Sequence, residues 1–245
     1  VARVDLSPMV ANTPVATITL ALSDNNGRPV ARYQREVYLT AWQAPATIEE
    51  QTPAKAFVPR LPDAGGDPAK VDWTKAAVLT GWREINGAPT PQQYAARIAH
   101  DGHSLYVKLE GPYIAAELQT DGAIWGGDHW QLVFAKERAA PYRRIGVNSQ
   151  GAFQQLTSLK QPDGAALPLC GPNVVSDLAK DHWTVLVAMP LETLVIGGLK
   201  SGSVCYSDFF RHTGGGDVFR ECFAWTPTFQ TDVHVPEQFG ELTLQ

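Results

Sequence analysis

The feature that most constrains the fold of this chain is the alternation of apolar and polar residues in many short segments. Between Trp130 and Phe134, the large residues Trp130, Leu132 and Phe134 fall at every second position. A period of two places these side chains on one face of a β-strand and the intervening ones on the other. The segment therefore predicts a half-buried strand.

Similar segments recur along the chain and are separated by turns rich in glycine and proline. A helical turn is expected only at residues 191–194, after Pro190. Short strands at close spacing, with almost no helical periodicity, predict an all-β fold, an antiparallel β-sandwich. The predicted strands are 15–22, 30–38, 96–100, 105–109, 130–134, 142–148, 152–157, 182–189, 204–212, 223–226 and 240–244.

The chain divides into three predicted regions. Residues 1–45 carry two or three strands, too few for a stable domain, so they are either an edge element of the sandwich or the tail of an upstream domain. Residues 46–70 are rich in proline and include the pair Gly65-Gly66, which is the composition of a linker. Residues 71–245 are predicted to form the sandwich. Because these N-terminal strands are too few to form a domain alone, we expect the natural polypeptide to extend before Val1.

Charge and hydropathy argue against two classes of partner. The net charge is −5 and no run of Lys and Arg is longer than two, which disfavours nucleic acid and anionic membranes. No apolar segment reaches the length of a spanning helix.

Motifs for catalysis are missing from the sequence. It contains no G-x-S-x-G, no glycine-rich phosphate loop and no Cys-His nucleophile signature. A glycosidase needs two positioned carboxylates, and no motif marks such a pair. We therefore expect no catalytic activity.

The metal-ligating residue types show no diagnostic spacing. The six histidines form no H-x-x-x-H or H-x-H motif, and Cys170, Cys205 and Cys222 form no C-x-x-C pair. The sequence allows one disulfide among the three cysteines and does not decide whether it forms. Four aspartates offer oxygen ligands for calcium, but without the spacing of an EF-hand loop. They are Asp101, Asp121, Asp128 and Asp208.

Trp125 precedes the strand at 130–134, on a loop with the pair Gly126-Gly127 and with Asp128. An indole beside a carboxylate suits a sugar ring, through stacking on the apolar face and a hydroxyl hydrogen bond. The other interpretation is a core tryptophan and a turn aspartate, because tryptophan is usually largely buried.

The order of several motifs resembles the family 9 carbohydrate-binding modules and the related sandwich domains of the DOMON fold, over about residues 50–245. The motifs are Asp72-Trp73-x-x-Ala76, Asp101-Gly102-x-x-Leu105-Tyr106-Val107, Trp125-Gly126-Gly127-Asp128, Tyr142-Arg143, Val147-Asn148-x-x-Gly151, Trp183-Thr184-Val185, Arg211, Trp225-Thr226-Pro227-Thr228 and Pro236-Glu237-x-Phe239-Gly240.

This resemblance implies a non-catalytic sandwich that binds saccharides between tryptophans, with calcium supporting the fold in several members. Trp125 matches a sugar-facing tryptophan, Asp128 the acidic position after it, and Arg143 lies near the binding arginine. Gln131 stands where the family often has glutamate. A second stacking tryptophan is expected just before Pro236, but this chain has Val233-His234-Val235. His234 is then a weak stacking candidate.

Arg144, Asn148 and Arg211 are also considered for the ligand-binding site. Arg143 and Arg144 are adjacent and so point to opposite faces of a strand, and we favour Arg143 for the ligand side. Asn148 and Arg211 are also candidates, although a turn residue and a rim salt bridge are the more common roles. The ligand-binding candidates are Trp125, Asp128, Gln131, Arg143, Asn148, Arg211 and His234.

The sequence thus predicts a carbohydrate-binding module of a larger secreted, cell-surface or periplasmic glycan-processing protein. The first alternative is a structural sandwich that binds no ligand and positions a neighbouring domain. The second is haem binding, because some relatives of this fold hold haem through Met and His. Met189 lies in the apolar run 185–189, where a core role explains it better.

Overall fold

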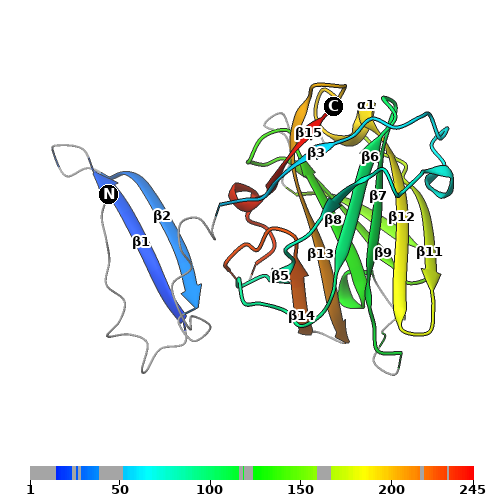
Figure 1. Cartoon of the computed structure of the whole chain (residues 1–245). Coiled ribbons are helices and arrows are strands. Elements are labelled where there is room, and N and C mark those ends of the chain that lie inside the picture. Colours follow the sequence, from blue (N-terminus) through cyan, green and yellow to red (C-terminus); the bar gives the residue numbers. More distant parts are fainter. Residues whose placement is uncertain are drawn as a thin grey trace. The chain divides into compact units, whose positions relative to one another are not determined.

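The computed structural model describes residues 15–23, 26, 29–38, 52–115, 118, 124–158, 167–215, 218–230 and 232–245 (Figure 1). The chain divides into two compact units, residues 1–50 and 51–245. In the first unit, β1 (Val15–Ser23) pairs antiparallel with β2 (Pro29–Tyr38). Both strands were predicted from the sequence; most of the turn between them lies outside the described residues.

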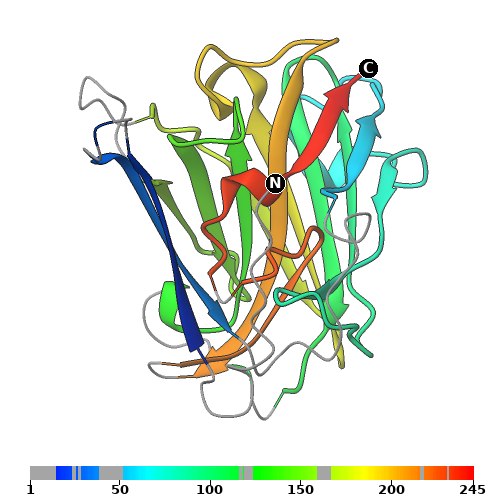
Figure 2. The same ribbon diagram turned by 90° about the vertical axis from the view of Figure 1, so that its left-hand side faces the viewer.

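The second unit contains two sheets. Among its described residues the larger sheet has eight strands in the order β10-β9-β8-β13-β14-β5, with β15 beside β13 and β3 beside β15. Among the described strand pairs of this sheet, only β15 and β3 are parallel, and Figure 2 shows these two strands side by side. The strands are β3 (Lys55–Val58), β5 (Arg83–Glu84), β8 (His129–Ala135), β9 (Tyr142–Asn148), β10 (Phe153–Ser158), β13 (Val204–Gly215), β14 (Val218–Ala224) and β15 (Gly240–Leu244).

The smaller sheet has five described strands in the order β11-β12-β7-β6-β4, all antiparallel. The hairpin predicted at 96–109 is β6 and β7, and the turn that follows Pro190 is α1, as predicted. The strands are β4 (Ala77–Leu79), β6 (Ala95–His100), β7 (Ser104–Pro112), β11 (Asn173–Leu178) and β12 (His182–Pro190); the helices are α1 (Leu191–Leu194) and the 3-10 turns η2 (Pro68–Lys70), η3 (Ile124–Gly126) and η4 (Pro236–Gln238).

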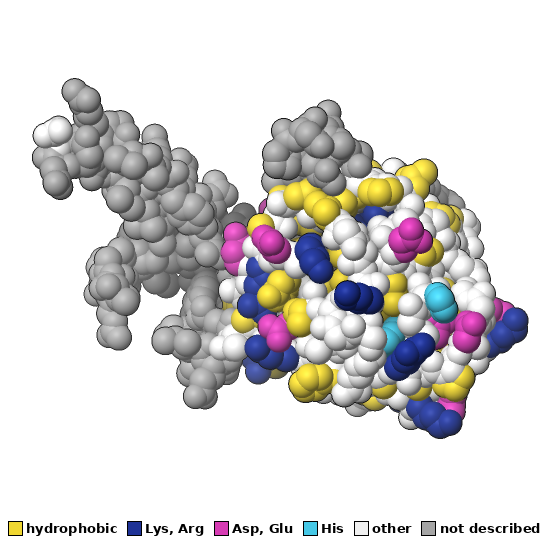
Figure 3. Space-filling view, turned by 90° about the horizontal axis from the view of Figure 1, so that it is seen from above, with side chains coloured by type: hydrophobic (Ala, Val, Ile, Leu, Met, Phe, Trp, Pro, Cys, Tyr) yellow, Lys and Arg dark blue, Asp and Glu magenta, His cyan; other side chains and the backbone are white. Residues whose placement is uncertain are grey.

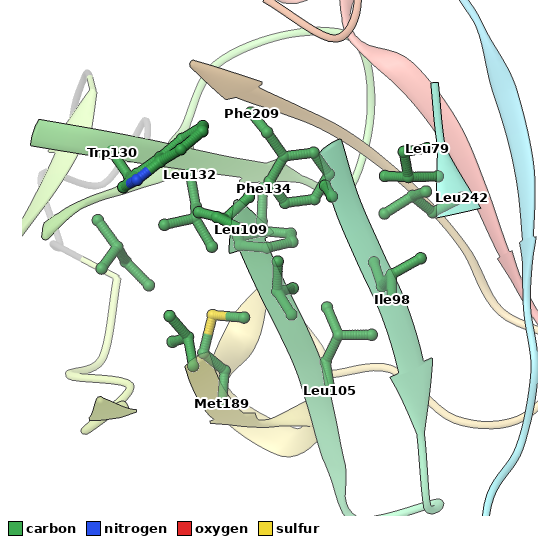
Figure 4. Packing of buried hydrophobic residues seen from close by; sticks show 14 of the residues in the cluster. Leu79, Ile98, Leu105, Leu109, Trp130, Leu132, Phe134, Met189, Phe209 and Leu242 are labelled. Atoms are coloured by element: carbon green, nitrogen blue, oxygen red, sulfur yellow. The ribbon is translucent and has the colours of Figure 1, made fainter. Parts of the chain in front are cut away.

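The main hydrophobic core lies between the two sheets. Trp130, Leu132 and Phe134 of β8 are fully buried on the face that looks toward the smaller sheet, here called the inner face. Figure 4 shows them packed with Leu105, Leu109 and Met189. The structure therefore confirms the predicted antiparallel sandwich and places Met189 in its core. The resemblance to DOMON domains stays a prediction.

The opposite face of the larger sheet, here called the outer face, is also covered, contrary to the prediction of a half-buried strand. All seven residues of β8 are buried. On the outer face Val133 and Ala135 belong to a second cluster with Phe239, against which Val233 packs. The reason is tertiary: the segment after Trp225 returns across this face before β15 begins.

The proposed linker also differs from the structure. Residues 55–58 form β3, which pairs with the last strand of the chain, and the pair extends the larger sheet. Arg60 bridges to His100, and Ala64 packs in a small cluster with Tyr106 and Ala188. The prolines in this region thus mark turns of a segment that belongs to the second unit, whose boundary falls at residue 51.

All three cysteines lie among the described residues and are free thiols. In the described part of the chain, no helix is long and apolar enough to cross a membrane. The end of the second unit shown in Figure 3 carries basic and acidic side chains interspersed with polar and apolar ones.

Candidate functional site

The register of the larger sheet decides which predicted site residues can meet. Gln131 of β8 lies opposite Gly146 of β9, and His129 lies opposite His212 of β13. Paired residues share a face of the sheet. These four residues therefore lie on the outer face, whereas their neighbours in sequence point into the core.

Trp125 lies in η3, which contacts β9, and its indole rests against the outer face. A Cβ built on Gly146 would stand 2.9 Å from Cη2 of Trp125, so only glycine leaves room for the ring there. The guanidinium carbon of Arg144 lies 4.7 Å from the ring centroid, and His129 meets the ring edge-on at 5.4 Å. We call Trp125, His129, Gln131, Arg144 and Gly146 the Trp125 surface.

The Trp125 surface carries buried donors that nothing in the described part of the chain satisfies. Nε1 of Trp125, Nε2 of Gln131 and Nε of Arg144 have no hydrogen-bond partner there. Gln131 is 1% exposed, whereas the Trp125 side chain is partly exposed. Because a buried donor without an acceptor costs about 1–3 kcal/mol, these atoms favour a ligand that supplies acceptor oxygens.

Two stacked imidazoles continue the Trp125 surface toward β13. The rings of His129 and His212 are 4.3 Å apart at 13°, and Nδ1 of His129 donates to the carbonyl of Gly127 at 2.9 Å. Burial, chiefly, lowers the pKa of His129 to about 4 and that of His212 well below its usual value. Both rings are therefore neutral at pH 7 and act as polar, uncharged groups.

His234 lies at the other side of Arg144. Its Nδ1 is 2.8 Å from Oη of Tyr142, and the two rings are 6.2 Å apart. Tyr142 and Arg144 occupy alternate positions of β9 and so share the outer face. The predicted candidate His234 is thus held near Arg144, which helps to lower the pKa of His234 after the larger effect of burial.

Arg143 does not join Trp125, contrary to the expectation that it lines the ligand side. Its Nε donates to the carbonyl of Leu194 at 2.8 Å, and its Nη2 donates to those of Thr193 and Pro168 at 2.6 and 2.7 Å. It is fully buried. The prediction that the two arginines of β9 point to opposite faces holds, but Arg144 is the one beside Trp125.

Asp128 and Arg211 are also not part of the Trp125 surface. Nη2 of Arg211 donates to Oδ1 of Asp128 at 2.6 Å, and both side chains are buried, at 1% and 5% exposure. Arg211 lies over Trp183 at 4.8 Å, on the inner side of the sheet. The pair is therefore a buried ion pair rather than a rim salt bridge, and it separates Asp128 from Trp125.

Asn148 has the turn role that its position before Gly151 favours. Its Oδ1 accepts from the backbone nitrogens of Gln150 and Ala152 at 3.1 and 2.9 Å. The aspartates considered for calcium are engaged separately: Asp101 accepts from Ser104 and Tyr106, and Asp208 from Phe209 and Thr226. Asp121 lies outside the described residues, and the described ones contain no group of three acidic, His or Cys side chains suited to a metal.

Four residues of this region were not predicted as site residues from the sequence: His129, Arg144, Gly146 and His212. His129 could have been found from the sequence, because it lies two residues before Gln131 and so shares a face of the strand with it. The role of Gly146 and the choice between the two arginines required the β8–β9 register, which no local pattern contains.

Comparisons with known proteins support the fold. No known family profile matches the sequence, and no curated protein matches it. A candidate carbohydrate-binding protein from Bacteroides uniformis has a similar structure at 16% identity and a TM-score of 0.59, covering 78% of this chain and 99% of that one.

Two structures of a family 9 carbohydrate-binding module from Caldicellulosiruptor kristjanssonii are also similar. The complex with cellotriose gives 14% identity and a TM-score of 0.54, covering 78% of this chain and 93% of that one. The complex with glucose gives 16% and 0.53, covering 78% and 95%. Over this part of its length, the chain has the β-sandwich fold of the family 9 carbohydrate-binding modules.

Proposed function

We propose that residues 51–245 form a non-catalytic carbohydrate-binding module, and that the saccharide binds at the Trp125 surface. The observation that carries this proposal is the group of unpartnered donors on Trp125, Gln131 and Arg144 beside a partly exposed indole. Sugar hydroxyl oxygens accept such hydrogen bonds, and the C–H face of a pyranose packs on an aromatic ring.

Arg144 sets the expected strength of binding. Its guanidinium covers the indole in the free protein, so a sugar reaches the ring only after this side chain moves aside. His234 stands where a second stacking tryptophan was expected, and stacking from one side buries less apolar surface. We therefore expect a dissociation constant of about 0.1–1 mM, which corresponds to about 4–5.5 kcal/mol.

Calorimetric titration of the full chain and the variant Trp125→Ala with glucose, cellotriose and a wider glycan set tests the site. We expect Trp125→Ala to weaken binding at least about tenfold, because the platform for the sugar face is removed. Trp73→Ala is the matched control: Trp73 is also partly exposed, but it packs in the small cluster with Tyr106, away from the larger sheet.

Equal affinity in Trp125→Ala and the unaltered chain would place the ligand elsewhere. Absence of binding for every saccharide at millimolar concentration would favour the alternative of a structural sandwich. In a structural sandwich without a ligand, the contact of Arg144 with Trp125 would serve only to pack the indole against the sheet.

The wider context belongs to the same proposal. A module without catalytic groups serves a larger glycan-processing protein, and we expect that protein to be secreted, periplasmic or on the cell surface. The full reading frame of the gene tests this expectation directly. Turnover of a glycan by residues 51–245, lost on mutation of one carboxylate, would contradict the non-catalytic assignment.

A further inference from the structure

A pocket separate from the Trp125 surface lies at the end of the sandwich where β7 ends and β8 begins, which is the lower end of the second unit in Figure 1. It is a pocket of about 370 Å³, at the small end of the usual size range of ligand pockets. Its lining comes from both sheets and not from the Trp125 surface.

The buried ion pair lies in this lining. Arg211 donates through Nη2 to Asp128 and through Nη1 to the carbonyl of His212, and its plane lies against Trp183. Its third donor, Nε, is buried and has no partner in the described part of the chain. Arg211 is 1% exposed, so the pocket has a buried guanidinium in its lining.

The side chains that line the pocket indicate which class of ligand fits it. Tyr94 and Tyr113 provide aromatic surface, and Gln92 and Thr213 provide neutral polar groups at the rim. The pocket holds one cation, Arg211, against two carboxylates, Asp128 and Glu221. An anion would therefore meet a net negative site, whereas a neutral molecule with several hydroxyl groups meets donors, acceptors and ring faces together.

We infer that this pocket is a second binding site, for a small neutral polyhydroxylated ligand of the size of one or two sugar units. It is separate from the Trp125 surface because the two lie on opposite sides of β8: Asp128 and Arg211 face inward, whereas Gln131 and Gly146 face outward. Hydroxyl groups of the ligand pair with the polar side chains of the lining, and an apolar face of the ligand packs on the tyrosines.

Nuclear magnetic resonance titration of the full chain with D-glucose tests the site, because each surface has its own reporter. The backbone amides of Thr213 and Gly214 and the side-chain amide of Gln92 report on the pocket, and the indole N–H of Trp125 reports on the outer face. We expect saturable shifts of the pocket signals in the unaltered chain and in Trp125→Ala. D-glucuronate should bind at least about tenfold more weakly than D-glucose.

Thr213→Tyr fills the pocket from its rim, and Thr213→Ser is the matched control that keeps the hydroxyl and the space. The shifts at Gln92 should vanish in the tyrosine variant and persist in the serine variant. Retention of these shifts in Thr213→Tyr, or equal binding of glucuronate, would overturn the inference.

The two sites fail independently. Shifts confined to Trp125 and abolished by Trp125→Ala would remove the pocket and leave the proposed function intact. Shifts confined to the pocket would support the second site and contradict saccharide binding at the Trp125 surface. No saturable shift at either surface up to about 100 mM, equivalent to about 1.4 kcal/mol of binding free energy, would remove both.

Discussion

At the scale of single residues, Gly146 controls the position of Trp125. A Cβ at this position would stand 2.9 Å from Cγ2 of Ile124 and 2.9 Å from Cη2 of Trp125, closer than carbon atoms pack. We therefore expect Gly146→Ala to displace the indole from the sheet and to weaken saccharide binding by about tenfold or more, with a stability loss of about 1–3 kcal/mol from overpacking. Tryptophan fluorescence and calorimetry measure the two effects.

Gly126→Ala is the control for this substitution. Gly126 lies in the same short helix as Trp125, but nothing lies within 4 Å of a Cβ built there. It should keep both the affinity and the fluorescence spectrum of the unaltered chain. If Gly146→Ala behaves like Gly126→Ala, Gly146 does not position the ring.

At the scale of elements, two adjacent arginines of β9 have different roles. Arg143 stabilises the fold, and Arg144 belongs to the proposed binding surface. Arg143 holds the carbonyls of Thr193 and Leu194 at the end of α1, whereas Arg144 lies on Trp125. We expect Arg143→Met to destabilise the fold by on the order of 3 kcal/mol, because charge-assisted hydrogen bonds to buried carbonyls are lost. The saccharide affinity of the folded fraction should not change.

Arg144→Met is predicted to show the opposite pattern, with changed affinity and little loss of stability. Chemical denaturation and calorimetry on both variants check the pair of expectations. A large affinity loss in Arg143→Met at full stability would restore the role that the sequence suggested for Arg143.

At the scale of the whole molecule, the buried imidazoles couple stability to pH. The folded state holds the pKa of His129 at about 4, below its value of 6.5 in the absence of burial. A depressed pKa stabilises the fold above pH 6.5, and the contribution is lost as the pH falls from 6.5 toward 4. His129 alone then accounts for about 3 kcal/mol across this window.

His129→Phe isolates this contribution, because a phenyl ring keeps the stacking surface on His212 but does not titrate. Its unfolding free energy, measured by urea denaturation from pH 7 to 4, should fall less steeply than that of the unaltered chain. Asp208 acts in the opposite direction in both proteins, since burial raises its pKa. Parallel curves would show that His129 does not carry the acid sensitivity.

The sequence by itself determined the class of fold and much of its core. Alternation in 130–134 and the apolar run 185–189 predicted strands, and Trp130, Trp183 and Trp225 are buried as expected. Such patterns are local, because a strand repeats every two residues and needs no knowledge of its neighbours. The opposed directions of Arg143 and Arg144 followed from the same rule.

Tertiary structure alone decided which side of each strand forms a site. The β8–β9 register selects Arg144 over Arg143, and the pairing of Asp128 with Arg211 spans 83 residues. The return of the segment after Trp225 buries the outer face, and the pairing of β3 with β15 joins a proline-rich stretch to the sandwich. Each depends on contacts between residues distant in sequence, whose free energy appears only when the sheets close around a common core.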